Sequence, residues 1–256
     1  MEVNSIVVAD AFEFLESLPD ESIDLVLTDP PYESMMRWAG KGTTARMGMG
    51  AKGTGSDNLA EKFFKTIPNS SLPELFRQFY RVLKPGHHCY VFCDWRTMFV
   101  IWRDVVEAGI FPSRKRYGVV MEPFKPLVWD KIAPGLGYSY RARYEIILFL
   151  WKWGKVGRRR LADLGVPDVL GFKRVHPGQA IVPTQKPDGL FELLIRQSTE
   201  EEEIVLDPFM GSGTTARAAV RAGRQFVGCD ISEKAVKAAL RSVATARAQP
   251  MIPGMV

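Results

Sequence analysis

Short apolar runs alternate with amphipathic stretches along most of the chain. The runs at 23–28 (IDLVLT) and 89–93 (CYVFC) are rich in aliphatic and aromatic side chains, which predicts buried strands. Further strands are expected at 117–121, 127–129, 145–151, 203–206 and 225–229. Helical spacing predicts helices at 11–18, 72–83, 98–108 and 188–197, after Gly213 and from Ser232. This alternation is typical of an α/β fold with a mostly parallel sheet.

Two segments interrupt the alternation. Residues 34–58 contain six glycines and no acid before Asp57, which predicts a flexible basic loop spanning about 33–67. The loop contains a G-x-G-x-x-G spacing at 48–53. No predicted strand leads into it and no predicted helix follows it, so we do not interpret it as a cofactor site. Residues 152–182 carry seven cations and two acids, an excess equal to the net charge of the whole chain, +5. A solvated surface and a nucleic-acid contact both explain such a segment.

The composition favours a globular protein of one domain. The 256 residues are 46% hydrophobic and 25% charged, which excludes a disordered chain and a disulfide scaffold. No apolar run approaches the roughly 18 residues of a membrane span, and acids occupy the place of a basic signal-peptide start, so a cytoplasmic protein is expected. Three scattered cysteines, and His87 and His88 without a ligand-spaced partner, predict no metal site.

The segment 207–215 (DPFMGSGTT) follows a predicted strand and opens a predicted helix. Gly211 and Gly213, with Ser212 and Thr214 beside them, let the backbone approach a ligand at the carboxyl end of that strand. A Walker-type phosphate loop needs a lysine that this segment lacks, which argues against a nucleoside triphosphate.

Asp230 ends the next predicted strand, about 20 residues beyond the glycines. A carboxylate in this place is suited to accept hydrogen bonds from ribose hydroxyls, so a nucleoside-containing ligand is expected. The alternative is that Asp230 only caps the helix that begins at Ser232.

Residues 29–32 (DPPY) close the first predicted strand. Two prolines stiffen the backbone and leave carbonyl groups to accept hydrogen bonds from a ligand. An acceptor carboxylate on Asp29, rigid carbonyls and the aromatic face of Tyr32 are suited to hold a planar base by its exocyclic amine.

With these segments the chain resembles the amino-group DNA methyltransferases that use S-adenosylmethionine. The matching segments are DPPY at 29–32, PTQKP at 183–187 and DPFMGSGTT at 207–215, with further similarity at 8–32, 127–131 and 141–149. The catalytic segment precedes the cofactor segment, as in the permuted β group of that family. The resemblance implies a Rossmann-like methyltransferase fold with helices on both faces of the sheet and a single catalytic domain, 1–256.

The resemblance also implies a cofactor site and a catalytic turn. The residues implied to bind S-adenosylmethionine are Asp10 and Ala11 at its adenine, Asp230 at its ribose, Asp207, Phe209, Gly211 and Lys186 at its methionine end, and Ser212, Gly213 and Thr214 in the same loop. Asp29 and the Pro30 carbonyl would accept hydrogen bonds from the amine, Pro31 would stiffen the turn, and Tyr32 would stack on a flipped base. Asp10 as a helix N-cap and Lys186 as an ordinary surface charge are the alternatives.

Double-stranded DNA is the partner that the resemblance implies. We expect phosphate contacts from Arg158, Arg159, Arg160, Lys173 and Arg174, within a small target-recognition insert at about 152–182. The family usually has histidine before PTQKP, whereas this chain has Val182, and the insert is short, so the loop at 34–58 is expected to share target recognition. The sequence does not decide whether subunits pair as a homodimer or whether a cognate restriction endonuclease exists.

The expected product is N6-methyladenine, because Asp before Pro-Pro-Tyr accompanies adenine more often in this family. The alternatives are N4-methylation of cytosine and, from a different class, a catalytically silent DNA-binding protein with the same fold. Methyltransferases that act on RNA or on protein glutamine fit less well, because of the permuted order.

Overall fold

The computed structural model describes residues 1–33, 66–117, 119–135, 140–155, 157–176 and 185–248. Most of the predicted basic loop at 33–67 lies outside these ranges, as do Val182 and the first two residues of the PTQKP segment. Within the described part of the chain, no helix has the length and apolar character needed to cross a membrane.

The elements are, in chain order, β1 (Ser5–Val8), α1 (Ala11–Ser17), β2 (Ile23–Thr28), the 3-10 helix η2 (Asn69–Ser71), α4 (Leu72–Val82), β3 (Leu83–Cys93), α5 (Trp95–Ile101), the π-helical segment η3 (Trp102–Glu107), β4 (Arg114–Arg116), β5 (Val119–Met121), β6 (Phe124–Asp130), β7 (Tyr144–Trp151), β8 (Val169–Gly171), α6 (Asp188–Ser198), β9 (Ile204–Asp207), α7 (Thr214–Arg221), β10 (Gln225–Asp230) and α8 (Glu233–Ala248).

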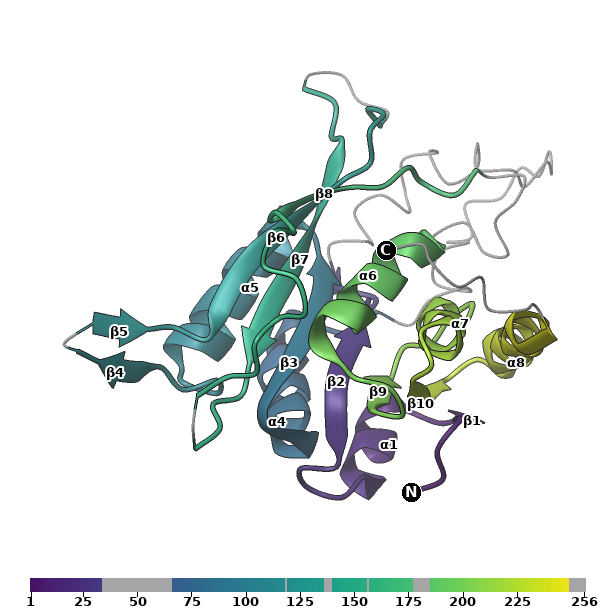
Figure 1. The fold of residues 1–256 in the computed structure, drawn as a ribbon, viewed down its shortest axis with the longest axis horizontal. Coiled ribbons are helices and arrows are strands. Elements are labelled where there is room, and N and C mark those ends of the chain that lie inside the picture. Colours follow the sequence, from purple (N-terminus) through teal and green to yellow (C-terminus); the bar gives the residue numbers. More distant parts are fainter. Residues whose placement is uncertain (34–65, 118, 136–139, 156, 177–184, 249–256) are drawn as a thin grey trace.

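Eight strands form one sheet in the order β1-β10-β9-β2-β3-β7-β6-β8 (Figure 1). The first five are mutually parallel, β7 runs antiparallel to both β3 and β6, and β8 is parallel to β6. Thus β2, which carries the DPPY turn, lies directly beside β9, which carries the glycine-rich turn. The predicted α/β class, the mostly parallel sheet and the permuted order of the motifs are confirmed.

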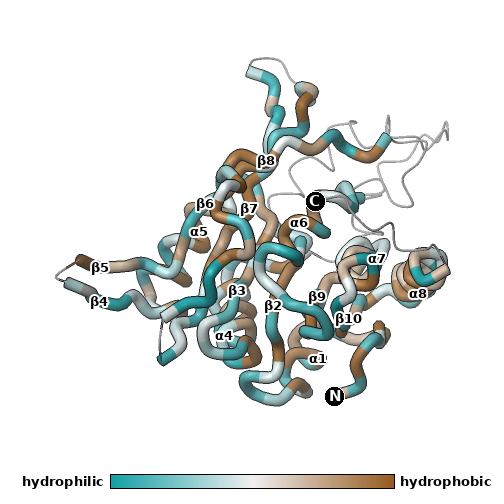
Figure 2. Tube along the Cα trace, in the orientation of Figure 1, coloured by the Kyte–Doolittle hydropathy of each residue, from teal (hydrophilic) through white to brown (hydrophobic). Residues whose placement is uncertain are grey.

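Helices cover both faces of the sheet, each over its own core. Leu15 of α1, Phe76 of α4 and Ile101 of α5 belong to one buried cluster. Phe191 of α6, Ala218 of α7 and Val236 of α8 belong to the other. Figure 2 shows hydrophobic and hydrophilic residues mixed along α4, α7 and α8, as helices with one buried side require.

Several predicted boundaries were wrong for identifiable reasons. The helix expected at 72–83 and the strand expected at 89–93 left residues 84–88 as a connection, but β3 begins at Leu83. The pairing with β2 shifts register between Ile23 and Leu25, so β3 bulges at Pro85 and Gly86 instead of beginning after them. The expected helix at 98–108 begins earlier, at Trp95, and continues as a π-helical segment.

The expected strand at 117–121 is not part of the main sheet. Its last three residues pair with β4 in a separate hairpin, which projects from the body of the protein in Figure 1. The edge strands β1 and β8 were not predicted, because they have only four and three residues. A run that short gives no clear period.

Candidate active site at the carboxyl edge of the sheet

Four acidic residues gather where β1, β10, β9 and β2 end. Asp207 and Asp230 are the last residues of β9 and β10, Asp29 directly follows β2, and Asp10 lies two residues beyond β1. Because these strands are parallel, their carboxyl ends meet at one edge of the sheet, which we call the carboxyl edge. Open α/β sheets bind ligands at this edge.

Asp207 joins the two motifs. Its carboxylate accepts hydrogen bonds from Thr28 Oγ1 at 2.6 Å, from Thr215 Oγ1 at 2.5 Å and from the Phe209 amide at 3.0 Å. Burial raises its pKa to about 6, although these donors favour the charged form. Since Thr28 immediately precedes Asp29, one buried carboxylate fixes the DPPY turn relative to the glycine-rich turn.

The glycine-rich turn depends on glycine at two positions. Gly213, with φ of +81°, precedes α7, and a Cβ there would lie 2.8 Å from Cα of Ala239. Gly228 in β10 passes so close to the turn that a Cβ would meet the backbone oxygen of Asp207. These close approaches hold the turn against α8 and β10. Ser212 and Thr214 lie in it with their hydroxyls 3.3 Å apart.

Asp230 and Asp10 are both used by the backbone around them. Asp230 accepts from the amides of Gly211 and Ser232, each at 2.9 Å. The helix cap that we weighed as the alternative falls to Ser232, whose hydroxyl accepts from the α8 backbone. Asp10 is the N-cap of α1 and accepts from the Phe12 amide at 2.9 Å, as its alternative stated. A carboxylate has about four acceptor positions, so both acids retain capacity for a ligand.

Asp29 forms an ion pair with a buried lysine. Lys186 Nζ lies 2.5 Å from Asp29 Oδ2 and 3.1 Å from Glu145 Oε2. The Lys186 side chain is only 10% exposed, so it is not an ordinary surface charge. Burial raises the pKa of Asp29, and the Lys186 ammonium opposes that rise. Although burial alone would lower it, the pKa of Lys186 is raised by the two carboxylates.

A second lysine extends this arrangement. Lys131, just after β6, places Nζ 2.6 Å from Glu145 Oε1. Burial disfavours a charged Glu145, but Lys186 and Lys131 together lower its pKa. The order Asp29, Lys186, Glu145, Lys131 is therefore a row of alternating charges, which we call the charge row. No role was predicted for Glu145 and Lys131, although an acid in an otherwise apolar strand was a visible signal.

The DPPY turn is tied to the chain that follows residue 65. The Pro31 carbonyl accepts from the Ile67 amide at 2.7 Å, so this carbonyl is used within the protein, contrary to our expectation that the turn leaves its carbonyls to a ligand. Pro30 is buried. Tyr32 is bridged to Ile67 and packs partly against the core. Burial raises the pKa of Tyr32, which keeps its hydroxyl protonated.

The basic insert is divided between opposite edges of the sheet. Arg159 donates its backbone amide to Gly86 and its side chain to Glu200 and Glu203, at the end where the parallel strands begin. By contrast, β8 runs parallel to β6, so the exposed Lys173 and Arg174 follow it at the carboxyl edge. The structure thus places these two at the same edge of the sheet as Asp29, and the arginine run at the opposite edge.

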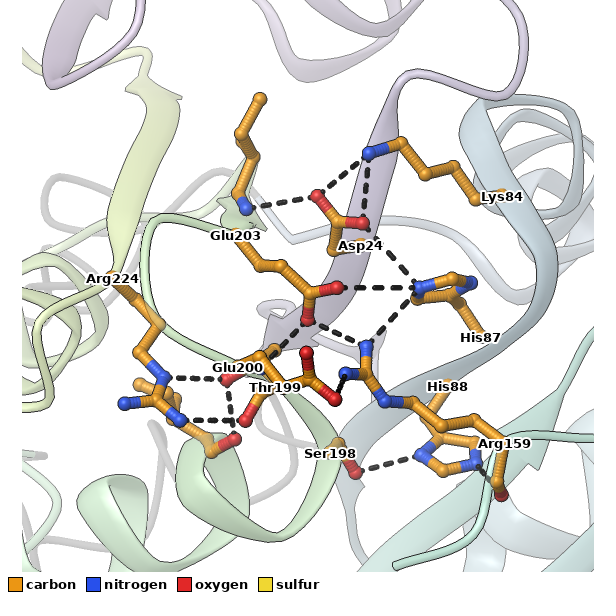
Figure 3. A network of polar contacts seen from close by, with 12 residues as sticks. Asp24, Lys84, His87, His88, Arg159, Ser198, Thr199, Glu200, Glu203 and Arg224 are labelled. Carbon is orange, nitrogen blue, oxygen red and sulfur yellow. Dashed lines mark hydrogen bonds and ion pairs between the residues drawn. The ribbon is translucent and has the colours of Figure 1, made fainter.

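A second polar cluster occupies the edge where the strands begin, which we call the amino edge (Figure 3). Asp24 binds Lys84 Nζ with both oxygens at 2.8 and 2.9 Å and accepts from the Ile204 amide. His87 Nε2 lies 3.4 Å from Asp24 Oδ1 and 3.8 Å from Glu203 Oε1. Our sequence reading gave His87 no partner, because these acids come from distant strands.

The amino edge has the residue types of a metal site but not the charge of one. Asp24, His87 and Glu203 place one candidate ligand atom each within 4.8 Å of one another. However, Lys84 already neutralises Asp24, and Arg159 Nη1 lies 2.5 Å from Glu203 Oε2. A divalent cation would meet two fixed positive charges there, so we interpret the cluster as a closed network of ion pairs.

The chain is similar in sequence and in fold to known DNA methyltransferases. The chain is 30% identical over 268 residues to DNA adenine methyltransferase YhdJ of Escherichia coli, covering 94% of this chain and 82% of YhdJ. It is 29% identical over 256 residues to Type II methyltransferase M.HpaI of Haemophilus parainfluenzae, covering 91% and 72%. The crystal structure of the M1.HpyAVI–SAM complex matches with a TM-score of 0.63 at 23% identity, over 93% of this chain and 98% of that one.

The match to a family extends over most of the chain. The family model described as DNA methylase (N6_N4_Mtase) covers residues 23–241, from β2 into α8. This span includes the DPPY turn, the charge row and the glycine-rich turn. The chain therefore belongs to the DNA methylase family.

Proposed function

We propose that this protein transfers the methyl group of S-adenosylmethionine to the exocyclic N6 of an adenine that has left the DNA duplex. The observation that carries the proposal is the 2.6 Å hydrogen bond between Thr28 and Asp207, which fixes the acceptor turn beside the glycine-rich turn. A methyl donor at one turn and an amine at the other would then lie close together.

The residues at the carboxyl edge fit the cofactor. Gly211, at φ of +52°, leaves the backbone bare where a ligand must approach, and Asp10 and Asp230 supply acceptors for an adenine amine and ribose hydroxyls. Lys186 has three N–H donors and uses two on Asp29 and Glu145, so the third can serve the methionine carboxylate. When bound, the cofactor supplies an electrophilic methyl group on a sulfonium.

The chemistry assigned to this chain is electrostatic. The exocyclic nitrogen is a weak nucleophile, because its lone pair is delocalised into the ring. Acceptors at Asp29 and the Pro30 carbonyl localise that lone pair and stabilise the positive charge that grows on nitrogen as the N–CH3 bond forms and the S–CH3 bond breaks. Tyr32 stacks on the flipped base and offsets part of the cost of unstacking it.

Adenine rather than cytosine is proposed from Asp29 in the DPPY turn, and the name of the E. coli relative supports that choice. Double-stranded DNA is the proposed partner, with Lys173 and Arg174 on the phosphates. The position of Arg158, Arg159 and Arg160 at the amino edge does not support our expectation for them. A homodimer, a cognate restriction endonuclease and a cytoplasmic location stay predictions.

The test is the modified nucleoside. Duplex DNA is incubated with the protein and S-adenosylmethionine, digested to nucleosides and separated by mass, and N6-methyldeoxyadenosine is expected. Asp29→Ala should reduce the rate at saturating cofactor by about a hundredfold or more while cofactor affinity changes little. N4-methyldeoxycytidine would overturn the choice of adenine, and cofactor binding without any methylated product would favour the silent DNA-binding protein.

A further inference from the structure

Glu145 and Lys131 lie outside both turns of the proposed active site, yet they are joined to it. Glu145 is the second residue of β7, and Lys131 follows the last residue of β6. These strands lie on the far side of β3 from the strands that carry the cofactor turn. Lys186 bridges the gap, because its ammonium contacts Asp29 on one side and Glu145 on the other.

The charge row is enclosed by apolar and aromatic side chains. The side chains of Lys186, Lys131 and Glu145 are 10%, 16% and 22% exposed. Lys186 Nζ lies 5.3 Å from the ring centre of Phe92, and Lys131 Nζ lies 5.1 Å from that of Trp129. In such surroundings charges act on one another more strongly than in water. Removing a charge at one end of the row therefore alters the electrostatic potential at the other end.

Stability alone does not account for an acid at position 145. The three residues after it, Ile146, Ile147 and Leu148, are buried and apolar. Burying an ion pair costs desolvation free energy that its attraction often only offsets, and well-packed apolar residues would serve the strand as well. The position of Glu145 beside Lys186 therefore indicates a functional role in the site.

We propose that Glu145, held by Lys131, is a positioning residue that draws Lys186 between two carboxylates and so keeps Asp29 able to accept a hydrogen bond from the substrate amine. If Asp29 were the one carboxylate beside Lys186, the ammonium would pair fully with it and weaken Asp29 as a hydrogen-bond acceptor. The second contact with Glu145, at 3.1 Å against 2.5 Å to Asp29, divides the attraction of the ammonium between two carboxylates and so weakens its hold on Asp29. The inference rests on the proposed function, because it assigns Asp29 the acceptor role.

Glu145 and Lys131, the two members of the row farthest from Asp29, act on it with opposite sign. The negative charge of Glu145 raises the pKa of Asp29, whereas the positive charges of Lys186 and Lys131 lower it. The neighbours Tyr32, Cys93 and Asp207 also lie within electrostatic reach of Asp29. Removing Glu145 or Lys131 should therefore move the ionisation of Asp29 in opposite directions, which a merely structural role would not produce.

The experiment compares the pH dependence of kcat for the wild type, Glu145→Gln and Lys131→Met at saturating DNA and S-adenosylmethionine. In Glu145→Gln the acid limb should move to lower pH by about one pH unit, and in Lys131→Met it should move to higher pH. At the plateau, kcat of Glu145→Gln should fall about tenfold with KM for DNA unchanged, and Glu145→Asp should recover part of that loss.

Glu203→Gln is the matched control, because it removes one carboxylate from the amino edge. Its acid limb should coincide with that of the wild type. Acid limbs that stay in place in both charge-row variants, or that move in the same direction, would overturn the inference while a methylating wild type upholds the proposed function. If Glu145→Gln does not fold, the direction of the Lys131→Met shift decides. A wild type without methyl transfer would instead overturn the proposed function.

Discussion

The two edges of the sheet each bury acids beside cations, but they distribute the charge differently. At the amino edge, Asp24 is paired with Lys84 and Glu203 with Arg159. At the carboxyl edge, Asp29 and Glu145 share Lys186. Burial raises the pKa of Asp29 and of Asp207, so ionising these acids costs free energy at the carboxyl edge. A cluster of charges therefore does not mark an active site by itself. What distinguishes the carboxyl edge is that its acids lie beside proline and glycine turns and that Asp207 accepts from neutral donors.

The largest expected effect that would distinguish the two edges is the loss of stability in Asp24→Ala. This change leaves the Ile204 amide and the partly exposed Lys84 ammonium without their acceptor, and removing the partner of a buried donor typically costs about 1–3 kcal/mol. Denaturant unfolding should show this loss, while kcat of the folded protein stays near that of the wild type. Glu233→Ala, which breaks an exposed pair with Lys237, is the control and should change little. A large loss of kcat in folded Asp24→Ala would mean that the two edges are coupled.

The second prediction concerns Asp207 and the pH dependence of stability. Its pKa is about 6 in the folded protein against an ordinary value of 3.8, so the folded state holds its proton more tightly than the unfolded state. The free energy of unfolding should therefore fall as pH rises from about 4 to 6, by at most about 3 kcal/mol from this group. Asp207→Asn should lack that decline.

Denaturant unfolding of both proteins at pH 4, 5, 6 and 7 measures the difference. Groups distant from Asp207 are common to the two proteins, so their contributions cancel in the comparison. Parallel curves for wild type and Asp207→Asn would show that the carboxyl edge carries no such cost at neutral pH.

The smallest effect concerns the divided basic insert. Replacing Lys173 and Arg174 by Ala should make the slope of log K against log salt for DNA binding shallower by about 1.8, if each neutralises one phosphate. Replacing Arg158 and Arg160 by Ala removes the same charge at the amino edge and should leave the slope unchanged. Binding titrations over a range of salt concentrations measure both slopes. The opposite result would place the DNA at the amino edge.

Much of the fold was predictable, because its inner strands and amphipathic helices have strong local patterns. The strand Ile23–Thr28 and the helix beginning at Leu72 were placed within a residue. The edge strands were missed, because three or four residues carry no clear period. The antiparallel direction of β7 is set by contacts with β3 and β6, which no local pattern encodes.

The site was predictable only where its residues stand in motifs. Asp29, Asp207 and Asp230 were proposed from the turns around them, and the structure brings them to one edge of the sheet. Glu145 and Lys131 were not, because they are joined to Asp29 only through Lys186, which follows them by some forty residues or more in the chain. The expectation for Arg159 came from a count of charges, which cannot tell that this arginine is paired with Glu200 and Glu203.

The hydrogen bond from Thr28 to Asp207 also bears on how the chain acquires its site. It joins residues 179 positions apart, and β2 pairs with β9 over the same separation. During synthesis, β2 has no neighbour on that side until residues 204–207 have been made. Contacts of such long range are entropically costly to form and slow a folding reaction. The catalytic and cofactor turns thus come together only after nearly the whole chain exists, and a truncated chain carries the DPPY turn without the glycine-rich turn beside it.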